Sequence, residues 1–257
     1  MNLPYFDLTG KVAIVSGGAT GIGNGIAEGL AEAGADLAII ARRGQVCEQA
    51  CRKIQDSTGV KAIALSCDIT DLESITAMLA QVMDTFGRID ILVNNAGVGG
   101  SEKPILEMTE KDWDIVMDTN LKGVFNLTRV VVPEMIAGGQ GGKIINVASI
   151  GAVIGWPHMS AYCASKGGCL QLTKSMALEW IRHDIQVNAI LPGYFETPMN
   201  TDFFASDAGK KAIKASIPMR RIAQIDEIKG AAILLASEAS SFITGSAITV
   251  DGGHTSG

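Results

Sequence analysis

The feature that most constrains the fold is a regular alternation of short apolar runs with longer helical patterns. The apolar runs have the length and aliphatic character of strands buried on both faces. They are Val12–Val15, Leu37–Ile40, Ala62–Leu65, Ile89–Val93, Lys143–Val147, Gln186–Ile190 and Ala247–Val250. The predicted helices are Gly23–Ala33, Val46–Thr58, Leu72–Phe86, one N-capped by Thr109 with Asp112 at the capping-box position, Ala161–His183 and Ile225–Leu235. This alternation predicts an α/β fold, a doubly wound parallel sheet with helices on both faces.

The chain is expected to form one domain over residues 1–257. It is 47% hydrophobic, it carries no repeat, and its composition does not shift as it would at a linker. The alternation is interrupted between Tyr194 and about Ile217. Because ligands of doubly wound sheets bind beyond the carboxyl ends of the strands, residues 194–217 are predicted to form a substrate lid.

Charge and cysteine content exclude several classes of partner. The net charge is −6 and no block of Lys or Arg stands out, which argues against nucleic acid and anionic membranes as partners. Five cysteines without a C-x-x-C spacing and three scattered histidines predict neither a disulfide framework nor a metal site. Reduced thiols and the lack of a signal-peptide pattern lead us to expect a cytoplasmic protein.

A glycine-rich segment joins the first predicted strand to the first helix. It reads Ser16-Gly17-Gly18-Ala19-Thr20-Gly21-Ile22-Gly23. Glycines allow a tight turn and a close approach to a pyrophosphate, and the helix N-terminus presents free N–H groups with a positive dipole end. We therefore expect Gly17, Thr20, Gly21, Ile22 and Gly23 to bind a dinucleotide; the alternative is a glycine-rich turn without a ligand.

The residues after the second strand bear on the choice of cofactor. An acidic residue at this place binds the ribose 2′-OH in the general dinucleotide fold, whereas this chain has Ala41 followed by Arg42 and Arg43. A guanidinium pairs with a 2′-phosphate, so NADP(H) is favoured and NAD(H) remains possible. The alternative is that both arginines begin a solvated helix.

Several further motifs occur in a fixed order along the chain. They are Asn94-Asn95-Ala96-Gly97, the set Asn120, Ser149, Tyr162 and Lys166, the pair Asp68-Ile69, and Pro192-Gly193 with Thr197. Together with the glycine segment, in which Ser16 replaces a threonine, they resemble the short-chain dehydrogenase/reductase family over nearly the whole chain. The resemblance implies a Rossmann fold, an alcohol/carbonyl oxidoreductase that uses NAD(P), and a homotetramer paired through the long helix and the C-terminal strand.

The resemblance also assigns roles to individual residues. It implies that Asn120, Ser149, Tyr162 and Lys166 are catalytic, with Asn120 anchoring a water in a proton relay to Lys166. It further implies that Asp68 and Ile69 flank the adenine of the cofactor and that Pro192, Gly193 and Thr197 lie beside its nicotinamide. The other residues that it implies in cofactor contact are Asn94, Ala96, Gly97, Tyr162, Lys166 and Phe195.

The residue types suit hydride transfer at a carbonyl. A proton must reach the oxygen on which negative charge builds up, and Tyr162 carries a suitable hydroxyl. Lys166 follows one helical turn later, so both side chains share one helix face, and a nearby cation favours the phenolate. Ser149 ends the fifth strand, where its hydroxyl can hold the substrate oxygen. The alternatives are an ordinary amphipathic pair for Tyr162 and Lys166 and a strand-end hydroxyl for Ser149.

The substrate is less constrained than the reaction. Apolar residues precede Tyr162 and occupy the predicted lid, where they could line a pocket, pack the lid or contact another subunit. No Lys or Arg lies in Ile150–Ala161 to clamp an anionic group, and a weak similarity to gluconate 5-dehydrogenases does not select the substrate. Sugar-derived ketones, cyclic alcohols, steroids and 3-oxoacyl thioesters stay open. Alternatives to the enzyme are a non-catalytic dinucleotide-binding redox sensor or scaffold and a transferase on a similar fold.

Overall fold

Seven parallel strands form one sheet, with the order β3-β2-β1-β4-β5-β6-β7. The strands are β1 Val12–Ser16, β2 Asp36–Ala41, β3 Ala62–Ser66, β4 Ile91–Asn94, β5 Gly142–Val147, β6 Ile185–Pro192 and β7 Ala247–Val250. The structure is a computed structural model that describes residues 3–196, 204 and 206–256. The strand order reverses between β1 and β4, which is where doubly wound sheets bind their ligands.

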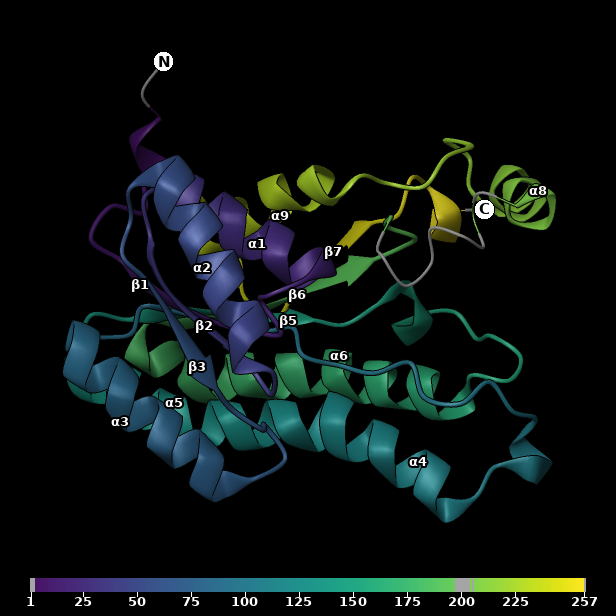
Figure 1. The fold of residues 1–257 in the computed structure, drawn as a ribbon, viewed down its shortest axis with the longest axis horizontal. Helices are drawn as coiled ribbons and strands as arrows, with labels where there is room; N and C mark the ends of the chain where they lie inside the picture. Colours follow the sequence, from purple (N-terminus) through teal and green to yellow (C-terminus); the bar gives the residue numbers. More distant parts are fainter. Residues whose placement is uncertain (1–2, 197–203, 205, 257) are drawn as a thin grey trace.

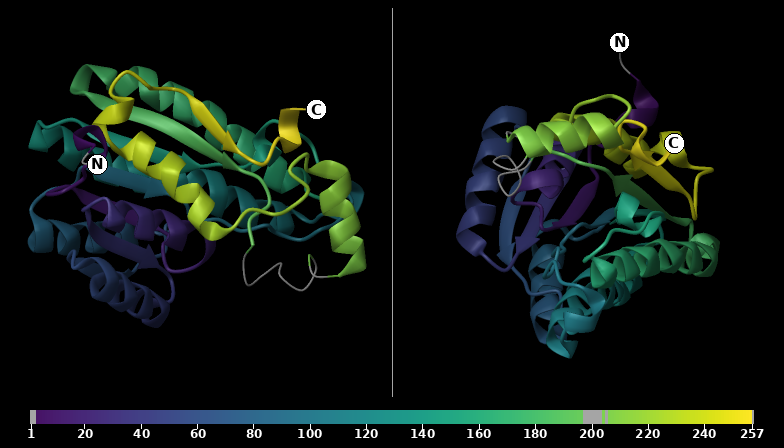
Figure 2. Two further views of the ribbon diagram at one scale, coloured as in Figure 1. Left: turned by 90° about the horizontal axis from the view of Figure 1, so that it is seen from above. Right: turned by 90° about the vertical axis from the view of Figure 1, so that its right-hand side faces the viewer.

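Helices cover both faces of the sheet (Figures 1 and 2). One layer holds α1 Gly21–Glu32, α2 Gly44–Thr58 and α9 Lys229–Ala236; the other holds α3 Leu72–Phe86, α4 Glu110–Met117, α5 Gly123–Gly138 and α6 Ser160–Trp180. Helix α8, Asp207–Ser216, lies at the end of the molecule toward which the strands point. This confirms the predicted doubly wound α/β sheet.

Each face of the sheet has its own hydrophobic core. Ile26 and Leu30 of α1 pack with Ile54 of α2 and Leu235 of α9 on one face. Met78 of α3 packs on the opposite face, together with side chains of α5 and α6. The central strands β1, β4, β5 and β6 are buried on both sides, which explains why they appear in the sequence as continuous apolar runs, whereas the edge strands β3 and β7 are partly exposed.

The predicted boundaries agree with the observed ones to within a few residues at most places. Helix α3 and strand β7 match the prediction residue for residue. The last predicted turn of the long helix, Ile181–His183, is a 3-10 turn that follows α6, and Ile225–Ile228 is a 3-10 turn that precedes α9. The capping box of Thr109 and Asp112 is also present, with each residue bonded to the backbone of the other.

The helix that begins after Thr109 is interrupted, which the sequence did not predict. A π-helical turn, Asp118–Lys122, separates α4 from α5. Helix α5 was not predicted as a separate helix; it contains Pro133 in its interior and glycines at both ends, which are residues of low helix propensity. Single π-turns inside helices occur frequently at functional sites.

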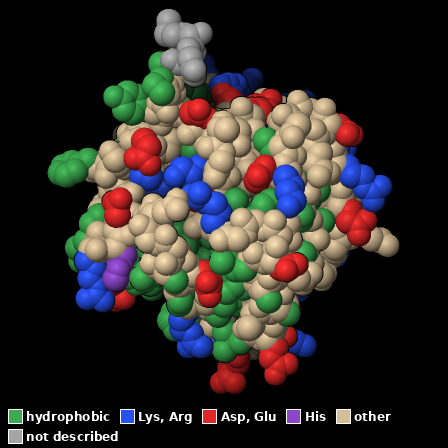
Figure 3. Space-filling view, turned by 90° about the vertical axis from the view of Figure 1, so that its left-hand side faces the viewer, with side chains coloured by type: hydrophobic (Ala, Val, Ile, Leu, Met, Phe, Trp, Pro, Cys, Tyr) green, Lys and Arg blue, Asp and Glu red, His purple; other side chains and the backbone are tan. Residues whose placement is uncertain are grey.

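Two further observations concern the charges on the surface and the length of the helices. Acidic and basic side chains are interspersed over the face shown in Figure 3, without a broad area of one sign. Across the described residues, no helix has the length and apolar character needed to cross a bilayer.

Candidate active site

The glycine segment forms a tight turn between β1 and α1. Gly17 and Gly21 have positive φ angles of 63° and 55°, a conformation that residues with a Cβ rarely adopt. A Cβ at Gly23 would overlap the carbonyl oxygen of Gly17. Thr20 is the N-cap residue of α1, but its side chain makes no capping hydrogen bond. The first N–H groups of α1 thus remain available to a pyrophosphate, and the geometry fits a dinucleotide.

Ser16 connects this turn to the segment that follows β4. Its hydroxyl accepts hydrogen bonds from the backbone N–H groups of Asn95, at 3.0 Å, and Ala96, at 3.1 Å, and donates to the carbonyl of Val93. The side-chain amide of Asn95 donates to the carbonyls of Ser16 and Gly17 at 3.0 and 3.1 Å. Serine and threonine both carry a hydroxyl, so these bonds explain why serine can stand at position 16, where the family motif has threonine.

Three residues predicted to bind the cofactor turn their side chains into the protein. The buried amide of Asn94 donates to Thr128 and Asn146. The side chains of Ile69 and Phe195 are 7% and 2% exposed and belong to the two cores. All three residues are buried, so their side chains support the site from within the protein and are not exposed to a ligand.

The residues predicted at the adenosine end lie at the carboxyl ends of β2 and β3. Arg42 and Arg43 are exposed, and the carbonyl of Arg42 accepts a hydrogen bond from Ser66 at the end of β3. The pKa of Asp68 is lowered, first by hydrogen bonds from Thr70 and to a smaller extent by the charge of Arg42. Arg42 and Asp68 are therefore close enough to interact at this edge.

The predicted nicotinamide end is formed by the segment after β6. Pro192 is the last residue of β6, and Gly193 donates its backbone N–H to Val250. A Cβ at Gly193 would come within 2.8 Å of the Asp251 backbone, so a larger residue would not fit there. Thr197, also predicted to bind the cofactor, lies outside the described residues.

Tyr162 and Lys166 lie one turn apart near the N-terminus of α6. Tyr162 is partly exposed, whereas the Lys166 side chain is buried. The Lys166 ammonium lies 5.8 Å from the centre of the Tyr162 ring and donates to the carbonyl of Val147 at 2.8 Å. This bond to β5 fixes the ammonium beside the tyrosine.

Asn120 lies within the π-helical turn and reaches the segment after β4. Its side chain accepts from the N–H of Val98 at 2.8 Å, donates to the carbonyl of Val98 and donates to the Ser165 hydroxyl. A Cβ built on Gly97 would lie 3.1 Å from Asn120 Oδ1 and 3.5 Å from Lys166 Nζ. The structure therefore brings Gly97, Asn120 and Lys166 to one point.

Ser149 follows β5 and supports the segment that packs against the tyrosine. Its hydroxyl accepts from the Gly151 N–H at 3.0 Å. A Cβ on Gly151 would lie 3.3 Å from the Tyr162 ring, and the Trp156 ring stacks on Tyr162 at 6.2 Å between centroids. The four residues of the predicted catalytic tetrad thus come from the π-helical turn, the segment after β5 and the start of α6.

Two parts of this site could not be identified from the sequence motifs. Asn95 is the residue of the Asn-Asn-Ala-Gly motif whose side chain holds the glycine turn, a role that depends on the pairing of β1 with β4. Tyr194 packs on Trp156 at 6.1 Å, and burial raises its pKa, with a smaller contribution from Tyr162. The available signal for Tyr194 was its position directly after the Pro192-Gly193 pair of the family motif.

The remaining titratable clusters do not form a metal site. No group of three or more His, Cys, Asp or Glu side chains suited to a metal ion occurs among the residues that the structure describes. All five cysteines are free thiols, and burial raises the pKa values of Cys51 and Cys67 to about 11.

Known proteins of the same fold match the chain over almost its full length. The family model described as enoyl-(acyl carrier protein) reductase matches residues 17–255. The chain is 41% identical over 255 residues to 2-dehydro-3-deoxy-D-gluconate 5-dehydrogenase of Escherichia coli, covering 98% of both chains. It is 39% identical to the NAD-dependent glycerol dehydrogenase of Listeria innocua, covering 97% of this chain and 96% of the relative.

A solved structure is similar to the chain in the same way. The gluconate 5-dehydrogenase of Burkholderia cenocepacia, in complex with NADP and tartrate, superposes with a TM-score of 0.93 at 39% identity and covers 98% of both chains. With the matched family model, these similarities establish that the chain belongs to the short-chain dehydrogenase/reductase family of NAD(P)-dependent oxidoreductases.

Proposed function

We propose that the protein interconverts a secondary alcohol and a ketone, with Tyr162 as the general acid and base. The observation that carries this proposal is the placement of Tyr162 beside a buried ammonium that is held by β5. The bound nicotinamide cofactor supplies or accepts the hydride. The chain itself orients the substrate and moves a proton.

In ketone reduction, the Tyr162 hydroxyl donates its proton to the substrate oxygen; in alcohol oxidation, the phenolate accepts it. The Lys166 ammonium stabilises the negative charge that develops on the tyrosine. The hydroxyl of Ser149 is proposed to donate a hydrogen bond to the substrate oxygen. It can do so while it still accepts the bond from the Gly151 N–H, or after that bond has broken.

Asn120 is proposed to hold in place the groups through which a proton is relayed to Lys166. Its side chain already bonds the backbone of Val98 and the Ser165 hydroxyl, and Ser165 in turn donates to the Tyr162 carbonyl at 2.7 Å. This network ties the π-helical turn to α6. A change at Asn120 is therefore expected to disturb the position of both Tyr162 and Lys166.

NADP(H) is the cofactor that we favour, because Arg42 and Arg43 stand where a carboxylate would select NAD(H). Arg42→Ala should weaken NADPH binding by about 10- to 100-fold, the loss of a charge-assisted hydrogen bond, and leave NADH binding within about twofold. Fluorescence titration with both cofactors measures this. Arg52→Ala, which removes an exposed arginine farther along α2, is the matched control. Equal losses for the two cofactors in Arg42→Ala would remove the 2′-phosphate role.

The substrate proposed first is a sugar-acid ketone or its alcohol. The support is the similarity to dehydrogenases of 2-dehydro-3-deoxy-D-gluconate and gluconate, and the glycerol dehydrogenase extends it to smaller polyols. The test follows reduced nicotinamide absorbance with sugar-acid, polyol, cyclic, steroid and 3-oxoacyl thioester substrates. Turnover confined to the last three classes would reject the sugar-acid assignment.

We extend the proposal to a homotetramer. Leu178 on α6 is 80% exposed, and Phe242, in the segment before β7, is fully exposed. Leu178 lies on the long helix and Phe242 next to the C-terminal strand, the two elements through which the family resemblance implies pairing. Light scattering coupled to size-exclusion chromatography should give four times the chain mass of 26.9 kDa, and a monomer at micromolar concentration would contradict it.

A further inference from the structure

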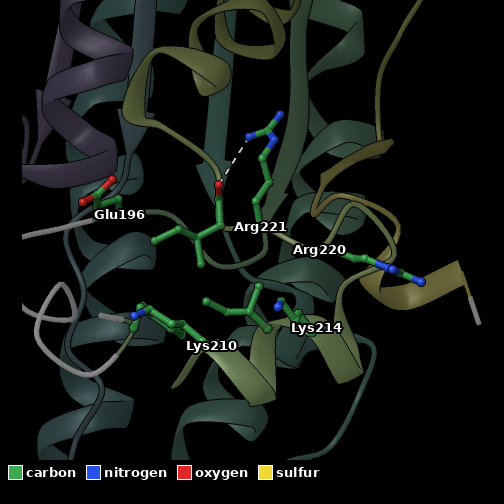
Figure 4. A pocket seen from close by; sticks show the side chains of 8 residues that line it. Glu196, Lys210, Lys214, Arg220 and Arg221 are labelled. Atoms are coloured by element: carbon green, nitrogen blue, oxygen red, sulfur yellow. Dashed lines mark hydrogen bonds between the residues drawn. The ribbon is translucent and has the colours of Figure 1, made fainter. Parts of the chain in front are cut away.

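A cavity outside the tetrad lies between α8 and the segment that follows it. It has a volume of about 280 Å³. Its walls come from α8, from residues 220–222, and from single side chains near β6 (Figure 4). The volume suits a molecule of roughly six to ten non-hydrogen atoms. The question is what kind of molecule the lining residues would attract.

The cavity combines an apolar wall with a cationic one. Ile213 of α8 is 8% exposed, and Ile222 and Phe204 complete the apolar side. Lys210 and Lys214 lie along the same side of α8 and border the cavity (Figure 4). Like charges four residues apart on a helix repel each other, so an anion placed between the two ammonium groups would relieve this repulsion.

The other charges around the cavity leave these two lysines available. Within the described part of the chain, neither ammonium forms an ion pair with a carboxylate, although the whole chain has a net charge of −6. Arg221 is already paired with Glu227 through two bonds of 2.6 and 2.7 Å.

Two further charged residues border the cavity, and neither cancels the lysines. Glu196 accepts a hydrogen bond from Gln224, and its oxygens point away from α8 (Figure 4). The Arg220 guanidinium extends away from the cavity, so we do not count it as a ligand. Lys210 and Lys214 therefore set the sign of the charge that the cavity offers.

The wall opposite α8 has a fixed backbone. Arg220 adopts a positive φ of 57°, which is uncommon for a residue with a side chain. The N–H of Arg220 donates to Ile217 at 2.8 Å, and that of Met219 donates to Gly252 at 3.1 Å. Strained residues held in this way occur frequently at ligand sites. By contrast, α8 presents few buried side chains to the rest of the molecule, so a ligand would order it.

The cavity adjoins the aromatic row that ends at the catalytic tyrosine. The Phe204 ring borders the cavity and meets Tyr194 edge-on at 5.4 Å; Tyr194 packs on Trp156, and Trp156 on Tyr162. A ligand in the cavity would therefore lie behind the aromatic row, apart from the substrate oxygen.

From this geometry we infer that the cavity is a binding site for a small amphipathic anion, a carboxylate with a short apolar body, set apart from Tyr162 by the aromatic row. The carboxylate lies between Lys210 and Lys214, and the apolar body packs on Ile213, Ile222 and Phe204. Binding orders α8.

Ligand-observed NMR titration tests this with hexanoate as the probe, hexanol as the neutral analogue and inorganic phosphate as the anion without an apolar body. Hexanoate should bind saturably with a dissociation constant of about 1–20 mM, as expected for eight non-hydrogen atoms. Hexanol and phosphate should each bind at least about tenfold more weakly, since hexanol lacks the negative charge and phosphate lacks the apolar body. Hydrogen exchange should slow in peptides from α8 on addition of hexanoate. Unsaturable hexanoate binding, or equal affinity for hexanol, would overturn the inference.

Lysine variants locate the site. Lys210→Met and Lys214→Met keep the aliphatic stems and should each reduce hexanoate affinity about fivefold, with a larger loss in the double variant. Lys211→Met is the matched control, because this exposed lysine lies on the same helix but does not border the cavity, and it should change affinity less than twofold. The double variant should melt no lower than the wild type, since a repulsion is removed. Wild-type affinity in the double variant, or an equal loss in Lys211→Met, would refute the assignment.

Discussion

The hydroxyl of Ser16 offers a sharp test of how the glycine turn is held. This hydroxyl is the acceptor for the N–H groups of Asn95 and Ala96 and a donor to Val93, and the serine itself is 1% exposed. Ser16→Ala removes all three bonds with a minimal change in volume. Each backbone N–H that loses its acceptor costs about 1–3 kcal/mol when buried.

The size of the effect follows from the exposure of the two donors. Asn95 and Ala96 are partly buried, so the lower part of that range applies and the variant should lose about 2 kcal/mol of unfolding free energy. For a domain of this length, such a loss lowers the melting temperature by about 4–8 °C. Affinity for the dinucleotide should also fall, because the same bonds fix the turn that cradles it.

Urea unfolding monitored by circular dichroism, together with cofactor titration, measures both effects. Ser16→Thr is the matched variant: it keeps the hydroxyl, and threonine is the residue that the family motif carries at this position. It should remain within about 1 kcal/mol of the wild type. A loss below about 0.5 kcal/mol in Ser16→Ala, or an equal loss in the threonine variant, would refute the reasoning.

The remaining predictions concern stability and thiol reactivity. Asp90→Ala removes the acceptor of the buried Val12 N–H and should cost about 2–3 kcal/mol in urea unfolding; a loss below about 0.5 kcal/mol would show that β1 does not depend on this bond. The bond from Arg221 lowers the pKa of Glu227 from 4.5 to about 2, so its contribution to stability is complete above pH 4.5 and disappears as the pH falls toward 2. Glu227→Gln should therefore lower the melting temperature at neutral pH and match the wild type near pH 2, and parallel curves would contradict this. Burial raises the pKa of Cys67 to about 11, so iodoacetamide should modify it only after unfolding, as mass spectrometry of native and unfolded samples can show; rapid modification of the native protein would contradict it.

The architecture was predictable because parallel strands buried on both faces have a strong sequence signature. The apolar run at Val12 is buried throughout in β1, and the helices on either side of β3 end, as predicted, before Gly59 and Gly87, which adopt left-handed conformations. The ends of the 225–235 helix were less accurate, because a 3-10 turn and an α-helix have the same local composition.

The residues of the site could be predicted from the sequence, but the hydrogen bonds between them could not. The motif positions identified Asn120 and Lys166, but no spacing in the sequence indicates that Asn120 occupies a π-helical turn or that Lys166 bonds the carbonyl of Val147. Both facts depend on how α4, α6 and β5 meet in space. The sequence likewise does not indicate that the side chain of Asn94 bonds Asn146 inside the protein while that of Asn95 bonds the glycine turn.

The proposed anion site behind Phe204 could not be predicted from the sequence for a different reason. The lysines of α8 form an ordinary solvated pattern in the sequence, and only the packing of α8 against residues 220–222 turns two of them toward one cavity. Residues 150–161 hold no Lys or Arg, and the lysines of the proposed site come instead from the segment after β6.

The most direct test of the central claim is Tyr162→Phe, assayed for turnover with the best substrate of the panel and, in parallel, for NADPH binding by fluorescence. Phenylalanine keeps the ring that stacks on Trp156 and removes only the hydroxyl. The proposed mechanism predicts that kcat falls by at least about 10²- to 10⁴-fold, the contribution of a general acid, while the dissociation constant of NADPH stays within about threefold. A variant that turns over at the wild-type rate would contradict the assignment of Tyr162 as the proton donor.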